Sequence, residues 1–381
     1  RRTSPSTCRL QYKDYDLYMR LRRKTYQTLQ DSINSVDVPY NFEPQFNLNY
    51  KKRWGDWLFN TQAESIHFTH PDKINHARGW RHLVYPSISY EWRQPGVFIV
   101  PKLGVHATQY NLSYVPNNTG INYDKNASRT LPIFSLDTGL LLERNARWFN
   151  QDVIQTLEPR LYYAYAPYRN QDQIWNFDSA LADLDFSRIY TENLFTGSDR
   201  IAQANQITTG LTSRILSKKT GEELLQASVA QRHYFSEQSV TLPNNTVSNT
   251  SRKSDILAAF SGRILPKLWA QGFAQYNIDN GKLLRSDASI RWQPGFRKVL
   301  NVGYHENKIL TEPVRTVYAS TQFPVSYISN NLYAVSRINY NLKTNKVTNA
   351  YAGFEYAKDC WVFRLVAQRE QTSSNQTNNS V

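Results

Sequence analysis

Apolar and polar residues alternate with a period of two over long stretches of this chain. From position 284 to 292 the even positions are apolar or small, while the odd positions from 285 to 293 are polar or charged. Successive side chains of a β-strand point to opposite faces, so such a segment has one face in apolar surroundings and one in water. The same pattern covers 268–278 and 332–342, and turns are predicted at Asp279-Asn280-Gly281 and around Asn345.

The first half of the chain repeats this pattern less regularly. Segments 97–107 and 157–165 alternate, but Pro86, Pro101, Pro159 and Pro324 fall inside or beside predicted strands. Proline cannot donate a hydrogen bond to the sheet, so these positions are expected at bulges or strand ends. The pattern predicts roughly 16 to 18 strands of about nine to eleven residues, the length that a tilted membrane strand needs.

Short turns alternate with long polar connections at 117–128, 170–198 and 242–254. This asymmetry is typical of outer-membrane barrels. No run of ~18 apolar residues predicts a membrane helix, and no linker divides the chain. The predicted fold class is therefore all-β, a large antiparallel transmembrane β-barrel of outer-membrane type, with residues 1–381 forming a single barrel portion.

Composition agrees with this prediction. The mean hydropathy is −0.60, which is compatible with a barrel because each strand is apolar on only one face. The 25 Tyr and 9 Trp suit the two membrane interfaces. The net charge of +14 is dispersed along strands and turns, which argues against a nucleic-acid-binding patch. It fits a polar lumen with a basic rim near anionic lipid, or solvated loop residues.

The sequence gives little support for catalysis. His67 and His70 lack the helical spacing of a zinc protease, and no G-x-S-x-G motif is present. Asp178, Asp183 and Asp185 could form paired carboxylates, but a solvated acidic loop that balances nearby arginines is the favoured interpretation. The two cysteines, Cys8 and Cys360, lack metal-site spacing. We therefore predict no enzyme activity, no catalytic residue, no cofactor and no metal.

A charged turn precedes an alternating strand in the segment from Ser198 to Arg214. Asp199 and Arg200, followed by Asn205 and Gln206, offer complementary donors and acceptors. We expect these four residues to form a packed polar cluster that fixes a loop at the mouth or inside the lumen; a solvated turn is the alternative. The amino-acid sequence of this segment resembles the signature of the LptD family, the lipopolysaccharide-assembly barrels of Gram-negative outer membranes.

The resemblance extends to other segments. Residues 157–172 and 177–179 are similar to a strand and loop of the family, although Trp175 stands where a proline is expected. Residues 353–361 resemble a segment in which many members carry two adjacent cysteines. Here Asp359 occupies the first of those positions. The resemblance thus implies a structural disulfide from Cys360 to the periplasmic part of the protein.

The resemblance also implies a fold, a function and partners. Members have a barrel fused to an N-terminal periplasmic jelly-roll, with an LptE-like plug lipoprotein in the lumen. Periplasmic Lpt bridge proteins deliver lipopolysaccharide, which the translocon inserts into the outer leaflet of the outer membrane. The chain opens Arg1-Arg2-Thr3 and has a polar tail, so we expect a fragment that lacks the jelly-roll and the terminal strands, with an incomplete barrel.

Two other interpretations remain open on the residues alone. A passive porin-type channel would share the alternating strands and the asymmetry between short turns and long loops. It would not require the particular sequence at 199–214 or a single cysteine near the end of the chain. A soluble all-β carbohydrate-binding or enzyme domain would be recovered without detergent, since exposed apolar strand faces require lipid or detergent.

Overall fold

The computed structural model describes residues 3–28, 38–117, 119–243, 250–310, 312–329, 331–358, 360–373 and 376–380. Within these residues the structure contains 21 β-strands and no helix. No helix capable of crossing a membrane is therefore found in the part of the chain that the structure describes. Asp359 lies outside the described residues.

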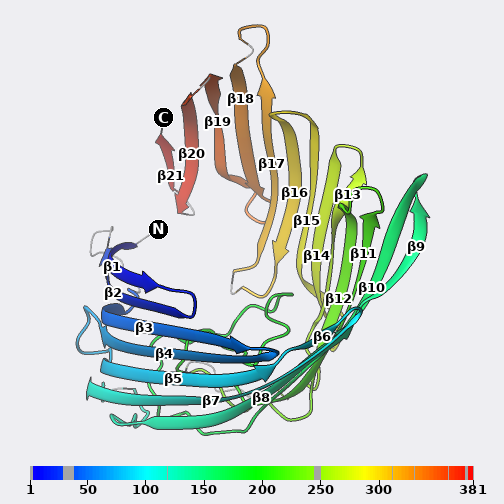
Figure 1. The fold of residues 1–381 in the computed structure, drawn as a ribbon. Helices are drawn as coiled ribbons and strands as arrows, with labels where there is room; N and C mark the ends of the chain where they lie inside the picture. Colours follow the sequence, from blue (N-terminus) through cyan, green and yellow to red (C-terminus); the bar gives the residue numbers. More distant parts are fainter. Residues whose placement is uncertain are drawn as a thin grey trace. The chain divides into compact units, whose positions relative to one another are not determined.

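The strands follow one another along the chain with short turns between most of them (Figure 1). The first eleven are β1 (Thr3–Lys13), β2 (Leu17–Thr28), β3 (Asn41–Trp54), β4 (Trp57–Thr69), β5 (Arg78–Tyr90), β6 (Trp92–Gln94), β7 (Val97–Tyr114), β8 (Ser128–Leu140), β9 (Leu142–Trp148), β10 (Gln151–Ala166) and β11 (Ala204–Ser217). The other ten are β12 (Glu223–Tyr234), β13 (Ile256–Leu265), β14 (Leu268–Asn277), β15 (Lys282–Gly295), β16 (Lys298–Asn307), β17 (Val314–Pro324), β18 (Leu332–Asn341), β19 (Lys346–Lys358), β20 (Trp361–Ser373) and β21 (Gln376–Ser380).

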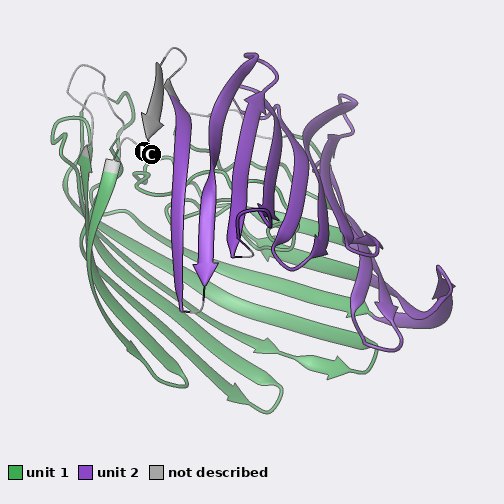
Figure 2. Ribbon diagram, turned by 90° about the horizontal axis from the view of Figure 1, so that it is seen from above, with its two compact units in different colours: residues 1–140, 160–209, 232–253 green, residues 141–159, 210–231, 254–381 purple. Residues whose placement is uncertain are grey.

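The chain divides into two compact units, coloured separately in Figure 2. Unit 1 comprises residues 1–140, 160–209 and 232–253, and unit 2 comprises residues 141–159, 210–231 and 254–381. Strands β10, β11 and β12 each contribute residues to both units.

In unit 1 most strands pair with their neighbour in sequence. Antiparallel ladders join β1 to β2, β2 to β3, β3 to β4 and β4 to β5. Strand β7 lies between β5 and β8, and the second half of β10 pairs with β8. Nearest-neighbour antiparallel pairing is the connectivity of an up-and-down sheet, as the alternating segments predict.

The core of unit 1 lies between the sheet and the long connection from β10 to β11, residues 167–203, which we call the inner loop. Ile174 and Phe177 of this loop join a buried cluster with Ile66, Phe68 and Tyr110 of the strands. The rings of Phe68 and Phe177 are stacked with centroids 4.2 Å apart. A second cluster packs Ile201 against residues of β8 and β10. Burial of these side chains is the main apolar contribution that holds the loop on the sheet.

Unit 2 continues with the same hairpin connectivity. Each strand from β12 to β21 pairs antiparallel with the next. Both turns named from the sequence are present, and Asn345 has the positive φ of 52° expected in a tight turn. The alternating segments at 268–278, 284–292 and 332–342 correspond to β14, β15 and β18.

The register in unit 2 separates two faces. Ala288 of β15 lies opposite Gly272 and Tyr304, whereas Ser289 lies opposite Gln271 and Gly303. On the even-numbered face Ile290 and Trp292 are 50% and 42% exposed. Large exposed apolar side chains on one face and polar ones on the other are the arrangement of a strand between lipid and water.

Two expectations need correction. The described residues contain 21 strands rather than 16 to 18, and many of these strands exceed eleven residues, with β7 reaching 18. The excess length means that these strands extend beyond the roughly nine to eleven residues that a membrane requires. Short strands such as β6, with three residues, carry too little pattern to be recognised.

Three of the four prolines lie at a break in strand pairing or at a strand end, and one does not. Pro159 separates the residues of β10 that pair with β9 from those that pair with β8, and Pro324 ends β17. Pro86 lies where the β5–β7 pairing is interrupted, between Val84 and Ser87. Pro101, by contrast, lies within the continuous ladder between β7 and β8.

Candidate functional site

The inner loop is anchored to unit 1 by the carboxylate of Asp199. This side chain is fully buried. Its Oδ1 accepts hydrogen bonds from Arg81 Nη1 and the Tyr110 hydroxyl, each at 2.8 Å. Its Oδ2 accepts the backbone N–H groups of Phe177 and Asp178, also at 2.8 Å each. Four donors therefore compensate a charge that would otherwise be costly to bury.

Arg81 of β5 is the opposite charge at the centre of this network. It is 1% exposed and donates to both carboxylate oxygens of Asp178, at 2.8 and 2.7 Å. Its Nη2 also donates to Glu64 Oε1 at 2.8 Å. One guanidinium thus joins two strands to two positions of the inner loop, which are 97 and 118 residues away from it in sequence.

The two loop carboxyls differ in acidity. Burial disfavours the charge on Asp199, but Arg81 and the donors at Asp178 outweigh burial and lower the pKa of Asp199 to about 2. Burial and the neighbouring charge of Asp199 raise the pKa of Asp178 to about 6, against the attraction of Arg81. Asp199 accepts four hydrogen bonds and Asp178 accepts three, two of them from Arg81.

Two further arginines bind carbonyl groups of the inner loop. Arg129 of β8 donates to the carbonyl oxygens of Ser198 and Asp199, at 2.8 and 2.7 Å. Arg200 is 1% exposed and donates to the carbonyl of Ile174 at 2.8 Å. Buried arginines that satisfy backbone acceptors fix the path of a segment that has no sheet partner along most of its length.

A glycine makes the close approach at Asp199 possible. Gly197 has a φ of 67°, and a Cβ atom there would lie 2.4 Å from the carbonyl oxygen of Asp178. Any larger residue would therefore push the two sides of the loop apart.

The four residues predicted as one cluster do not all meet. Asp199 and Arg200 belong to the buried network described above. Asn205, on β11, accepts a hydrogen bond from the Tyr163 hydroxyl at 3.0 Å, and Gln206 donates to the carbonyl of Thr191 at 3.5 Å. The two amides thus hold other parts of unit 1, and the role of all four residues at a partner interface stays a prediction.

Sequence reasoning missed the strand residues of the network. Arg81, Tyr110 and Arg129 lie on strands without any local motif, and only the fold brings them to Asp199. The interpretation of Asp178 as part of a solvated acidic loop is wrong, because Asp178 is paired with the buried Arg81. Asp185 accepts the backbone N–H groups of Ser187 and Arg188 and so stabilises a turn.

Both cysteines are free thiols and exposed in this structure. Cys360 lies in the turn between β19 and β20. A disulfide from Cys360 to another part of a longer protein stays a prediction. Among the described residues, no group of three or more His, Cys, Asp or Glu side chains could hold a metal ion.

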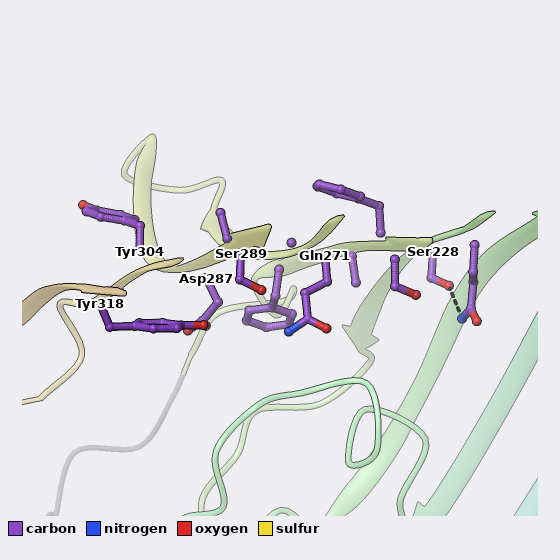
Figure 3. A pocket seen from close by; sticks show the side chains of 13 residues that line it. Ser228, Gln271, Asp287, Ser289, Tyr304 and Tyr318 are labelled. Atoms are coloured by element: carbon purple, nitrogen blue, oxygen red, sulfur yellow. Dashed lines mark hydrogen bonds between the residues drawn. The ribbon is translucent and has the colours of Figure 1, made fainter. Parts of the chain in front are cut away.

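A hollow of about 330 Å³ lies on unit 2 between β12 and β17. Figure 3 shows Gln271, Asp287 and Tyr318 on one side of the sheet there and Tyr304 on the other. The Tyr318 ring lies against Gly303, where a Cβ atom would be 2.3 Å from it. Hydroxyl, amide and carboxylate groups line this hollow together with the rings of Phe260 and Phe273, so its lining is mixed polar and apolar.

Comparison with known proteins places these features in a family. The family model for LPS transport system D, LptD, matches residues 3–327. The chain belongs to the LptD family. The matched range includes the inner loop and the segment from Ser198 to Arg214 on which the resemblance rests, so that prediction is confirmed. The segment 353–361 lies outside this range.

Curated LptD relatives match almost the whole chain. The LPS-assembly protein LptD of Burkholderia thailandensis is 37% identical over 371 residues, which are 96% of this chain and 46% of that protein. The LPS-assembly protein LptD of an Azoarcus species is 38% identical and covers 94% of this chain and 44% of its own length. The chain therefore spans about half the length of these LptD relatives.

Solved structures that resemble the chain include the ferric enterobactin receptor PfeA of Pseudomonas aeruginosa. That match is 9% identical, has a TM-score of 0.43, and covers 97% of this chain and 66% of the receptor. Membership of the LptD family, together with the two-faced antiparallel strands, gives the fold class as an outer-membrane β-barrel. The predicted location in the outer membrane, as a multi-pass β-barrel, is confirmed.

Proposed function

We propose that this chain is part of the barrel wall of a translocon that inserts lipopolysaccharide into the outer leaflet of the Gram-negative outer membrane. The match to the LptD family over residues 3–327 carries this proposal. The relatives named as LPS-assembly proteins support it. A family of transport and assembly proteins also supports a role without a catalytic step.

The inner loop gives this function a structural element that a simple pore does not need. Arg81, Tyr110 and Arg129 of the strands hold the inner loop against the sheet of unit 1 through its two carboxylates and its backbone carbonyls. Arg200 adds a hydrogen bond within the loop. We infer that the loop forms a fixed surface on the water-facing side of the strands. An LptE-like plug lipoprotein would bind such a surface without first having to order it, because the network has already met the entropic cost.

The remaining partners follow from the same family. Periplasmic Lpt bridge proteins would bring lipopolysaccharide to the part of the protein that this chain does not include. The chain itself would supply the wall and the surface that seats the plug. A passive porin-type channel would have no use for such delivery.

The test uses the full-length protein in cells whose own copy can be switched off. Loss of the protein should reduce lipopolysaccharide at the cell surface, measured with a surface-specific antibody, and the wild-type gene should restore it. If surface lipopolysaccharide stayed normal while only uptake of small solutes changed, the protein would be a passive channel.

The role of the loop is tested by Asp199→Ala combined with Asn205→Ala in the same cells. We expect less plug lipoprotein to co-purify with this variant and less lipopolysaccharide to reach the surface. Lys218→Gln with Lys219→Gln, in the turn between β11 and β12, is the control and should retain both. Normal co-purification and export in the Asp199 and Asn205 variant would separate the loop from partner binding.

A further inference from the structure

One face of the hairpin of β1 and β2 carries exposed leucines, and the other face is basic. Leu10 lies directly opposite Leu21, and both are exposed, at 70% and 45%. On the other face Arg9 lies directly opposite Arg22. The same face also carries Arg20 and Lys24, because residues two apart on a strand point the same way. We call Arg9, Arg20, Arg22 and Lys24 the basic strip.

No carboxylate pairs with the basic strip among the described residues. Arg20 donates to the amide oxygen of Asn47 at 3.0 Å, and Arg22 Nε donates to that of Gln45 at 2.9 Å. The ammonium group of Lys24 lies over the ring of Tyr26, 4.7 Å from its centroid. These hydrogen-bond and ring partners are all neutral.

The carboxylate that contacts both amides, Glu64, also has a partner of its own. Glu64 Oε2 accepts hydrogen bonds from Gln45 and Asn47, at 2.9 and 2.8 Å, and Glu64 Oε1 accepts one from Arg81. The two amides therefore form a neutral layer between the basic strip and the ion-pair network of the inner loop.

Arg23 follows Arg22 on β2, points to the other face of the hairpin and provides a contrast. Arg23 pairs with Glu43 at 2.7 Å. The lack of carboxylate partners is thus a property of one face of the hairpin. Like charges placed directly opposite one another on a sheet are destabilising, and an anion between them would remove this cost.

We propose that the basic strip binds the phosphate groups on the saccharide part of a glycolipid. This inference rests on the proposed function, which supplies lipopolysaccharide as the anionic glycolipid. Positions 20, 22 and 24 are spaced about 7 Å apart along β2, so the strip can contact several charged groups of one molecule. Arginine is suited to this role because its planar guanidinium binds phosphate through two parallel hydrogen bonds.

The test compares three probes on the full-length protein in detergent. The probes are native lipopolysaccharide, the same lipopolysaccharide after chemical removal of its phosphates, and inorganic phosphate alone. Arg9→Gln with Arg22→Gln should weaken binding of the native form about tenfold and leave binding of the dephosphorylated form unchanged. The control, Lys218→Gln with Lys219→Gln, removes the same charge from an exposed turn and should bind as the wild type does.

The outcomes separate the two proposals. If the wild type bound neither form of lipopolysaccharide, the proposed function itself would fail. If it bound both forms equally, or if the double variant bound the native form normally, the basic strip would have no role while the function stood. Complete displacement of native lipopolysaccharide by an equal concentration of inorganic phosphate would identify a simple phosphate site and overturn the saccharide assignment.

Folding of the variants is controlled separately. Arg9→Gln alone changes an exposed side chain that forms no hydrogen bond or ion pair with the described residues, so the variant should fold normally and still weaken binding of the native form. Arg22→Lys retains the charge and should keep more affinity than Arg22→Gln. Equal affinity of these two Arg22 variants would contradict an electrostatic role for this position.

Discussion

Asp199 and Asp178 both bind the guanidinium group of Arg81, yet they differ in burial and in pKa. Asp199 is fully buried and accepts four hydrogen bonds, and its lowered pKa keeps it charged. Asp178 is partly exposed, and its pKa is raised. A neutral amide should therefore be tolerated at Asp178 and poorly tolerated at Asp199.

We expect Asp199→Asn to destabilise the full-length protein by about 3–5 kcal/mol, because it removes the fully buried anion that pairs with Arg81 and places an NH₂ group among N–H donors. Asp178→Asn should cost clearly less. Urea unfolding of both variants in detergent, followed by loss of the heat-modifiable band on gels, measures the difference. Equal losses would mean that the two carboxyls play equivalent roles.

The pH dependence gives a second measurement on the same pair. A carboxyl whose pKa is raised on folding stabilises the folded state below its unfolded pKa and loses that contribution as pH rises through about 6. Asp199, with a lowered pKa, contributes above its unfolded pKa and loses this only as pH falls towards about 2. Between about pH 4 and pH 6, stability should thus fall less steeply with rising pH in Asp178→Asn than in the wild type.

At the scale of elements, the two faces of β15 make opposite demands on a charged side chain. Ala288 shares its face with the exposed Ile290 and Trp292, while Ser289 shares its face with Gln271 and the hollow shown in Figure 3. We expect Ala288→Arg to cost ~2–4 kcal/mol if the position lies near the middle of the bilayer, and Ser289→Arg to be tolerated. Folding yield into lipid vesicles measures both. Equal tolerance would show that the faces are assigned wrongly.

The strands could be predicted from the sequence where the local pattern of apolar and polar residues determines them. Strands β14, β15 and β18 were predictable because their alternation depends only on which residues face lipid. The network around Asp199 was half predictable: Asp199 and Arg200 are adjacent in one motif, whereas Arg81 is 118 residues from Asp199 in sequence. The basic strip was not found because the cations at positions 9 and 22 belong to different strands, and only the register brings them together.

At the scale of the whole molecule, the position of Cys360 suggests where it can react. It is exposed in the short turn between β19 and β20. Short turns of outer-membrane barrels face the periplasm, an oxidising compartment. Cys8 differs, because it shares its parity on β1 with Leu10, and hence the apolar face of the hairpin. A periplasmic segment can therefore reach Cys360, but it cannot reach Cys8.

We therefore expect Cys360 to form a disulfide with a part of the full-length protein that lies outside this chain. A bridge that closes a long loop restricts the unfolded chain and should stabilise the protein by about 2–4 kcal/mol. Cys360→Ser should change the mobility of the mature protein on non-reducing gels and release one free thiol, whereas Cys8→Ser should change neither the mobility nor the pairing of other cysteines. Peptide mapping that found a free thiol at Cys360 in mature wild-type protein would rule the bridge out, and the exposed turn would then have no covalent role.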